Sequence, residues 1–126
     1  MKRDWDLIRQ ILLACEAADP GQHLSNDAFP DVDGATLFQH VSILSSAGYL
    51  DARLMRYMET TDGGGTFIIL GMTWDGHDLA AKMASDTWWR KIKKAAADKG
   101  IGLTFDVIKA LAVPAAKEIL GLMTDA

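Results

Sequence analysis

The sequence predicts a mainly α-helical fold with a small β-hairpin, which is an α+β class. Five stretches carry apolar residues at the intervals that place them on one face of a helix. Between the second and third stretches, residues 49–57 and 66–72 are predicted as strands on either side of a glycine-rich segment at residues 62–65, as expected for a hairpin. With 126 residues, 49% of them apolar and 24% charged, the chain can bury a core of its own.

The first helix is predicted to begin after Asp4, whose carboxylate can accept hydrogen bonds from the unpaired N–H groups of a first helical turn. Apolar residues recur at helical spacing from Trp5 to Cys15, and the Asp-Pro-Gly run at residues 19–21 ends the pattern. Residues 22–32 are rich in Ser, Asn, Asp and Pro, so we expect them to form a loop.

A second helix is predicted over residues 34–47, with Asp33 as its N-cap. Its buried stripe is expected to consist of Leu37, Val41 and Leu44. Gly48 ends the helix, because glycine adopts a left-handed conformation without steric cost. Residues 49–57 and 66–72 then form the two strands of the hairpin.

Three further helices are predicted, with Thr73, Ser85 or Asp86, and Thr104 as their N-caps. The fourth helix buries Trp88, Trp89, Ile92 and Ala96, and Pro114 is expected to kink the last helix. Helix, helix, β-hairpin, helix is the order of a winged helix in which the loop at 22–32 replaces the usual short second helix. We therefore expect a winged-helix core at residues 1–84 and a C-terminal helical extension at 85–126, within a single domain overall.

Two sets of residues resemble known families. Residues 40–50 (HVSILSSAGYL) and 73–76 (TWDG) resemble the segments before and after the wing in small bacterial winged-helix transcriptional regulators. Residues 1–4 (MKRD), 6–9 (DLIR) and 70–79 (LGMTWDGHDL) together resemble an uncharacterised family of small bacterial and prophage proteins, a domain of unknown function, over about residues 1–98. The resemblance implies a winged helix in a phage or mobile-element setting, and it carries over no catalytic residue.

Charge is distributed unevenly along a chain whose net charge is −4. Residues 11–52 contain six carboxylates and no Lys or Arg, whereas residues 88–99 contain five cations and one carboxylate, Asp98. Such asymmetry bears on partners more than on fold. The single cysteine, the acidic N-terminal segment and the lack of an apolar stretch of membrane-spanning length predict a cytoplasmic protein that does not enter membranes.

The first functional hypothesis is a regulator that binds duplex DNA through the second helix, which would be the recognition helix. Thr36 and Gln39 are the candidates to contact base edges. The cations on the wing and in the basic run are the candidates to contact phosphates, namely Arg53, Arg56, Arg90, Lys91 and Lys94. A basic run of this kind is more often the solvated face of an amphipathic helix, with Trp88, Trp89 and Ile92 inside, and contact with phosphates is the less common role.

The alternative is a module that binds another protein, because the second helix carries no cation and Phe38 and Ile43 are expected on its outward face. A homodimer through the last helix is a related hypothesis. The residues expected at that contact form one apolar stripe: Ile108, Leu111, Ala115, Ile119 and Leu122.

The sequence predicts no enzyme. His23, His40 and His77 lack the spacing of metal ligands, and Gly63-Gly64-Gly65 lacks the Lys and Ser/Thr that follow a phosphate-binding loop. Cys15 is expected to be buried and unreactive. No cofactor, metal or small-molecule ligand is expected, and His40 is expected to pack beside the wing with its ring hydrogen-bonded to backbone.

Overall fold

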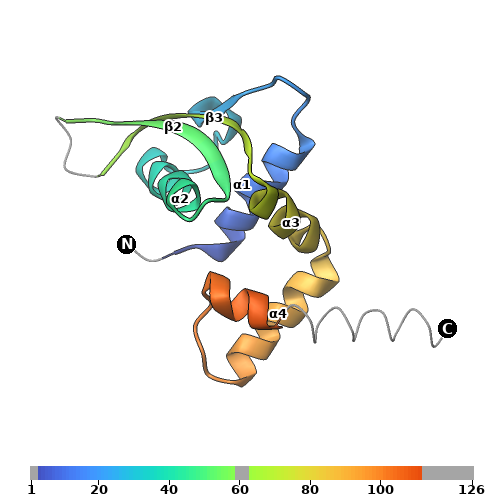
Figure 1. Ribbon diagram of the computed structural model, residues 1–126. Helices are drawn as coiled ribbons and strands as arrows, with labels where there is room; N and C mark the ends of the chain where they lie inside the picture. Colours follow the sequence, from blue (N-terminus) through green and yellow to red (C-terminus); the bar gives the residue numbers. More distant parts are fainter. Residues whose placement is uncertain (1–2, 59–62, 112–126) are drawn as a thin grey trace. The chain divides into compact units, whose positions relative to one another are not determined.

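A computed structural model describes residues 3–58 and 63–111 and has an α+β architecture of helices with one small antiparallel sheet (Figure 1). The chain divides into two compact units, residues 1–80 and residues 81–126, and the division falls within helix α3. The first unit contains the sheet and the helices packed on it. None of the described helices is long and apolar enough to cross a membrane.

Helix α1 (Trp5–Ala17) begins as predicted, because the Asp4 carboxylate accepts a hydrogen bond of 3.1 Å from the Leu7 N–H. Its buried face consists of Leu7, Ile8, Ile11 and Leu12. Cys15 at the end of the predicted stripe is only half-buried.

The segment expected to be a loop contains two regular elements, so that expectation was wrong in part. Strand β1 (Leu24–Ser25) pairs with β3, and a 3-10 helix, η1 (Asn26–Ala28), follows directly. The Asn26 side chain continues the pairing of β1: its Oδ1 accepts from the Phe67 N–H at 3.3 Å, and its Nδ2 donates to the Gly65 carbonyl. Pairing with a strand more than forty residues away, rather than local sequence, stabilises so short a strand.

Helix α2 (Gly34–Ser46) has the predicted cap. The Asp33 carboxylate accepts from the Thr36 N–H and from the Thr36 hydroxyl, both at 3.0 Å, and these bonds lower the pKa of Asp33. Gly48, at φ +85°, ends the helix, and the Tyr49 N–H donates to the Leu44 carbonyl at 2.9 Å. This is a Schellman-type helix end, which requires a left-handed residue at Gly48.

Strands β2 (Leu50–Arg56) and β3 (Gly65–Met72) form the predicted hairpin, and β1 adds to the far side of β3, so the strand order is β1-β3-β2. The register pairs Arg53 with Ile68 and Leu54 with Phe67, and the only irregularity between β2 and β3 falls at Asp51/Ala52. Helix α2 covers one face of this sheet, while the other face of the hairpin is exposed. We call these the inner face and the outer face of the hairpin.

Helix α3 (Trp74–Met83) begins where the chain leaves β3. The Thr73 hydroxyl accepts from the Gly76 N–H at 3.1 Å, as predicted, and donates to the carbonyl of Gly48. A β-carbon on Gly76 would lie only 2.0 Å from the Tyr49 carbonyl oxygen, so only glycine allows the helix to start this close to the strand.

In the second unit, α4 (Asp86–Asp98) is capped by Ser85 and buries the four residues that its pattern predicted, Trp88, Trp89, Ile92 and Ala96. A further helix begins at residue 105, and the Thr104 hydroxyl accepts from the Val107 N–H at 3.0 Å, also as predicted. Pro114 lies outside the described residues.

Candidate functional site

Helix α2 presents one side that is not covered by the rest of the first unit. Its buried residues are Leu37, Phe38, His40, Val41 and Leu44. The half-buried and exposed residues on the opposite side are Ala35, Thr36, Gln39, Ser42, Ile43 and Ser46, which we call the α2 face. The α2 face carries no charge and is dominated by hydroxyl and amide groups, which can both donate and accept hydrogen bonds.

Phe38 does not belong to the α2 face, contrary to the prediction that it points outward. Its side chain is fully buried, because the inner face of the hairpin covers it. The Arg56 guanidinium lies 5.6 Å from the centre of the Phe38 ring, and a β-carbon on Gly65 would lie 2.6 Å from a ring carbon. Ile43 is half-buried and is the one large apolar side chain left on this side of the helix.

His40 connects α2 to the start of α1. Its ring is hydrogen-bonded to backbone, as predicted, but the partners lie at the start of α1 and within α2 and not in the wing. Its Nε2 accepts from the Asp4 N–H at 2.8 Å, and its Nδ1 lies 2.7 Å from the Thr36 carbonyl oxygen. Since an N–H donates to Nε2, the geometry requires a neutral ring that carries its proton on Nδ1 and donates it to Thr36. This link holds the start of α1 against α2, and the preceding residue, Arg3, lies over the Trp5 ring with its guanidinium 5.5 Å from the ring centre.

The two arginines assigned to the wing lie on opposite faces of the hairpin. Arg56 is on the inner face, over the Phe38 ring, and therefore borders the α2 face. Arg53 is on the outer face, where it lines a groove. The structure thus brings Arg56 to the border of the α2 face and separates Arg53 from it.

Gln39 bridges α2 and the turn of the hairpin. Its Nε2 donates to the Gly63 carbonyl, so the amide that was expected to reach a base edge is engaged in holding the wing. Thr36 is exposed, although its hydroxyl donates to Asp33. Of the two residues predicted to contact bases, Thr36 is the more accessible.

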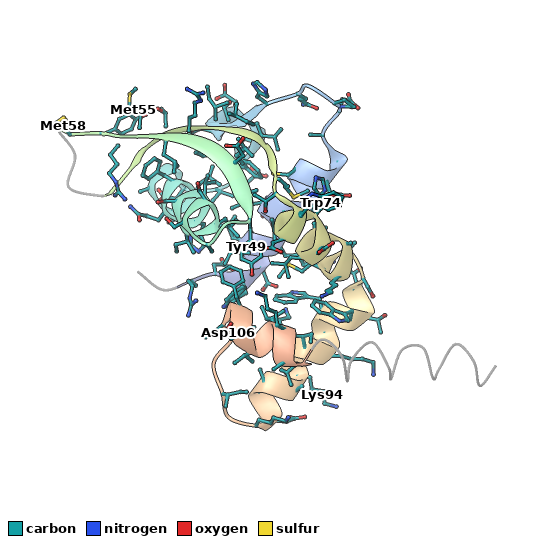
Figure 2. All side chains as sticks on the ribbon, viewed as in Figure 1. Tyr49, Met55, Met58, Trp74, Lys94 and Asp106 are labelled. Carbon is teal, nitrogen blue, oxygen red and sulfur yellow. The ribbon has the colours of Figure 1, made fainter. Side chains whose placement is uncertain are left out.

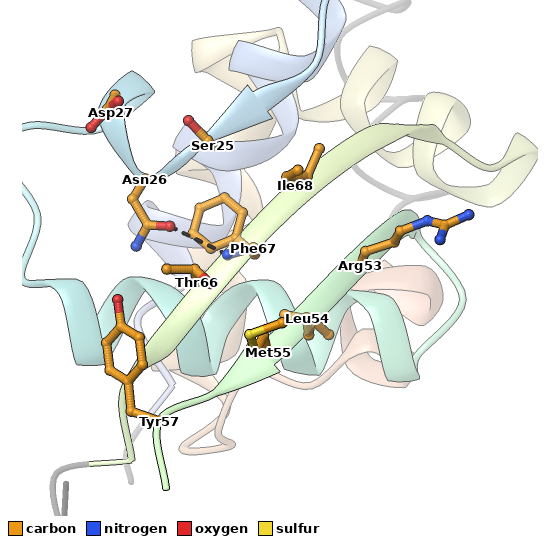
Figure 3. Close-up of a pocket in the computed structure, with 10 residues that line it drawn as sticks. All are labelled: Ser25, Asn26, Asp27, Arg53, Leu54, Met55, Tyr57, Thr66, Phe67 and Ile68. Atoms are coloured by element: carbon orange, nitrogen blue, oxygen red, sulfur yellow. Dashed lines mark hydrogen bonds between the residues drawn. The ribbon is translucent and has the colours of Figure 1, made fainter. Parts of the chain in front are cut away.

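The outer face of the hairpin is apolar and exposed, which sequence reasoning missed. Met55 is 69% exposed, Tyr57 50% and Ile68 45%. Together with Arg53, Thr66 and residues 25–27 they line a groove of about 580 Å³ (Figure 3). Met55 projects from β2 on the side away from α2 (Figure 2). Strict alternation along β2 would have placed Arg53, Met55 and Tyr57 on one face.

The basic cluster lies on one side of α4, in the second unit. Thr87, Arg90, Lys91 and Lys94 line a shallow hollow of about 250 Å³. Lys93 extends instead over the Trp89 ring, with its Nζ 5.6 Å from the ring centre. The cluster is therefore a compact cationic surface of this helix, with Arg90 and Lys94 exposed.

The apolar stripe assigned to a dimer contact is only partly within the described residues. Ile108 is 1% exposed and Leu111 9%, so within one chain both are already covered. The dimer contact through this stripe stays a prediction. Ala115, Ile119 and Leu122 lie outside the described residues.

Reactive side chains in the described part of the chain are few. Burial and, to a smaller extent, the neighbouring Glu16 raise the pKa of Cys15 to about 11, so this thiol is protonated at neutral pH. His77 Nδ1 lies 3.0 Å from the Glu16 carboxylate on the surface. Among residues 3–58 and 63–111 there is no cluster of three or more His, Cys, Asp or Glu placed to hold a metal ion.

Comparison with known proteins identifies relatives of the chain. A relative described as an uncharacterized protein of Haemophilus influenzae is 36% identical over 113 residues, which span 89% of this chain and 92% of the relative. No solved structure matches the chain significantly. The family model described as "Hypothetical protein (DUF2513)" matches residues 2–102. The chain therefore belongs to the DUF2513 family.

Proposed function

We propose that the first unit is a winged helix that binds duplex DNA through the α2 face, as a non-enzymatic regulator. The order of elements supports the fold: a helix, a short strand, a 3-10 turn, a second helix and a hairpin, followed by a third helix. In this proposal η1 takes the place of the usual short second helix, α2 is the recognition helix, and β2 and β3 form the wing. The sheet order β1-β3-β2 fits the same arrangement.

The observation that carries the proposal is the position of Arg56 at the border of the α2 face. Thr36, Ser42 and Ser46 offer neutral hydrogen-bonding groups of a size that can approach base edges and phosphates. Arg56 borders this surface on the wing side. In this proposal Arg3, which directly precedes the residue bonded to His40, approaches the duplex from the side of α1. Cations on either side of a recognition helix can neutralise phosphates along the major groove.

The charge pattern limits the strength of binding that we propose. Residues 11–52 carry six carboxylates and no cation of their own. With two arginines at the surface, we expect weak, strongly sequence-dependent binding whose affinity falls with salt at a log–log slope of about −2. The basic cluster on α4 would add to this slope if it contacts the same duplex.

Fluorescence polarisation with a labelled duplex, measured over a series of salt concentrations, tests the proposal. Ser42→Glu places a carboxylate in the α2 face and is expected to weaken binding at least tenfold. Thr66→Glu makes the matched change on the outer face of the hairpin and is expected to leave affinity nearly unchanged. Equal effects of the two variants, or no binding of the wild type to duplexes selected from a random pool, would refute the proposal.

The alternative, a module that binds another protein through α2, is supported by the absence of cations on the helix. Because Phe38 is buried, Ile43 is the residue on which such an interface would depend. The setting in a phage or mobile element rests on the family resemblance of residues 1–9 and 70–79.

A further inference from the structure

Strand β2 forms an open edge of the sheet. The Tyr57 N–H donates to the Gly64 carbonyl at 3.0 Å, and residues of an antiparallel strand face their partner strand alternately. Arg53 and Met55 therefore share hydrogen bonds with β3, whereas Leu54 and Arg56 direct their N–H and C=O groups away from it. The Phe67 N–H, opposite Leu54, confirms this phase, because it pairs with Asn26 on the other side of β3.

The two edges of the sheet differ in whether their backbone groups are paired. The far edge of β3 is closed by β1 and by the amide of Asn26. From Ala52 to Arg56, β2 contains no proline and no bulge, and nothing among the described residues pairs with its outer edge. An unprotected edge strand that also carries exposed apolar side chains is a template for pairing with another strand.

The side chains of β2 are complementary to a second copy of the same strand. If two β2 strands pair antiparallel about a two-fold axis at Met55, the two Met55 side chains meet, and Arg53 lies opposite Tyr57 of the second copy. Leu54 then lies opposite Arg56 of the second copy, and both of these have outward-facing backbone groups, so they can form a hydrogen-bonded pair. The exposed Met55 and Tyr57 gain apolar and cation–π contacts, and no like charges lie directly opposite each other.

A two-fold axis at Leu54 would also align outward-facing backbone groups, but it is less complementary. It places Tyr57 opposite Asp51, beyond the irregularity of the strand, and leaves Arg53 without an aromatic partner. Arg53 makes no ion pair or hydrogen bond within the part of the chain that the structure describes. The register at Met55 gives this cation a partner.

We infer that two copies of the chain pair through β2 about an axis at Met55, so that their hairpins form one continuous sheet. The inference concerns self-association without DNA and does not depend on the proposed function. It assigns the apolar outer face of the hairpin to a symmetric, closed interface. It also differs from the predicted dimer through the last helix.

Sedimentation equilibrium over the micromolar range, without DNA, tests the inference. The wild type is expected to be a dimer, and Leu54→Pro a monomer. Proline at this position removes an N–H that faces away from β3, so the hairpin itself is retained, as circular dichroism will check. Met55→Lys, which brings two ammonium groups to the axis, is expected to raise the dissociation constant at least tenfold, whereas Ile68→Lys on the same face leaves it nearly unchanged.

Cysteine cross-linking tests the register. In a Cys15→Ala background, Met55→Cys is expected to form an intermolecular disulfide on mild oxidation, since directly opposed residues bring their β-carbons close enough for one. Ile68→Cys, equally on the outer face but away from the axis, is expected to stay reduced. A wild type that stays monomeric, or a dimer that both β2 variants preserve, would overturn the inference, and so would cross-linking through residue 68 in preference to residue 55.

Discussion

Arg53 and Arg56 are close in sequence, on the same strand, yet they have opposite surroundings. Arg56 lies over the ring of Phe38 on the inner face of the hairpin, where α2 and the hairpin turn are joined through Gln39 and Gly63. Arg53 lies on the outer face, beside the exposed side chains of Met55 and Ile68. The inner face is part of the core of the first unit, and the outer face is not. Substitutions on the two faces should therefore affect different properties of the protein.

The largest effect is expected at Phe38, the aromatic side chain enclosed between α2 and the hairpin. Phe38→Ala should lower the free energy of unfolding by about 3–5 kcal/mol, because it removes a fully buried ring and leaves a cavity. Ile43→Ala, on the half-buried side of the same helix, should cost less than about 2 kcal/mol. Urea denaturation measures both, and equal losses would mean that the hairpin does not cover Phe38.

Glycines on β3 provide the next comparison. Gly65→Ala should lower the free energy of unfolding by about 2 kcal/mol, because the new methyl group would lie 2.3 Å from the Met55 carbonyl oxygen and against the Phe38 ring. Gly71→Ala is the matched control, since no atom lies within 4 Å of its β-carbon position, and it should change stability by less than about 0.5 kcal/mol. Thermal or chemical denaturation that fails to separate the two variants would contradict the close contact at Gly65.

The next comparison is between His40, whose buried ring links α1 to α2, and His77, which contacts Glu16 on the surface. His40→Ala should cost about 2 kcal/mol, since it leaves the Asp4 N–H and the Thr36 carbonyl without their partner. His77→Ala removes only an exposed contact with Glu16 and should cost less than about 0.5 kcal/mol. Hydrogen exchange at the Asp4 amide should accelerate in the first variant alone; an unchanged rate there would argue against the link.

The smallest effect concerns the cap of α2 and depends on pH. Hydrogen bonds from Thr36 lower the pKa of Asp33 in the folded protein, so the ionised cap contributes stability above the pKa of the unfolded chain. This contribution is lost as the pH falls through the lowered pKa, below the usual range of an aspartate. Asp33→Asn keeps a capping oxygen but does not titrate, so its stability should vary less with pH in this range. If the urea midpoints of the wild type and of Asp33→Asn vary with pH in the same way, the cap does not contribute to the loss of stability in acid.

Local chemistry made much of the fold predictable. The N-caps at Asp4, Asp33 and Thr73 each act through a backbone N–H three residues away, so the sequence around them is sufficient. The helix end at Gly48 and the hairpin around residues 62–65 follow from glycine in the same way. These signals place element boundaries, and the α+β class follows from them.

Contacts between distant segments were not predictable in this way. Strand β1 exists because β3 pairs with it, and Phe38 is buried because a hairpin some twenty residues later folds over it. The start of α1 is joined to α2 by the hydrogen bond between the Asp4 N–H and His40, which are 36 residues apart. By contrast, the alternation of side chains along a strand could have predicted that Arg53 and Arg56 lie on opposite faces.

The central claim, that the α2 face and not the outer face of the hairpin contacts DNA, is tested most directly by reversing the charge of each wing arginine. The measurement is the affinity for a single short duplex at one low salt concentration, with sedimentation to confirm the oligomeric state of each variant. Arg56→Glu should weaken binding at least tenfold, and Arg53→Glu should change it less than about threefold. Equal losses in the two variants, or a greater loss in Arg53→Glu, would contradict the account.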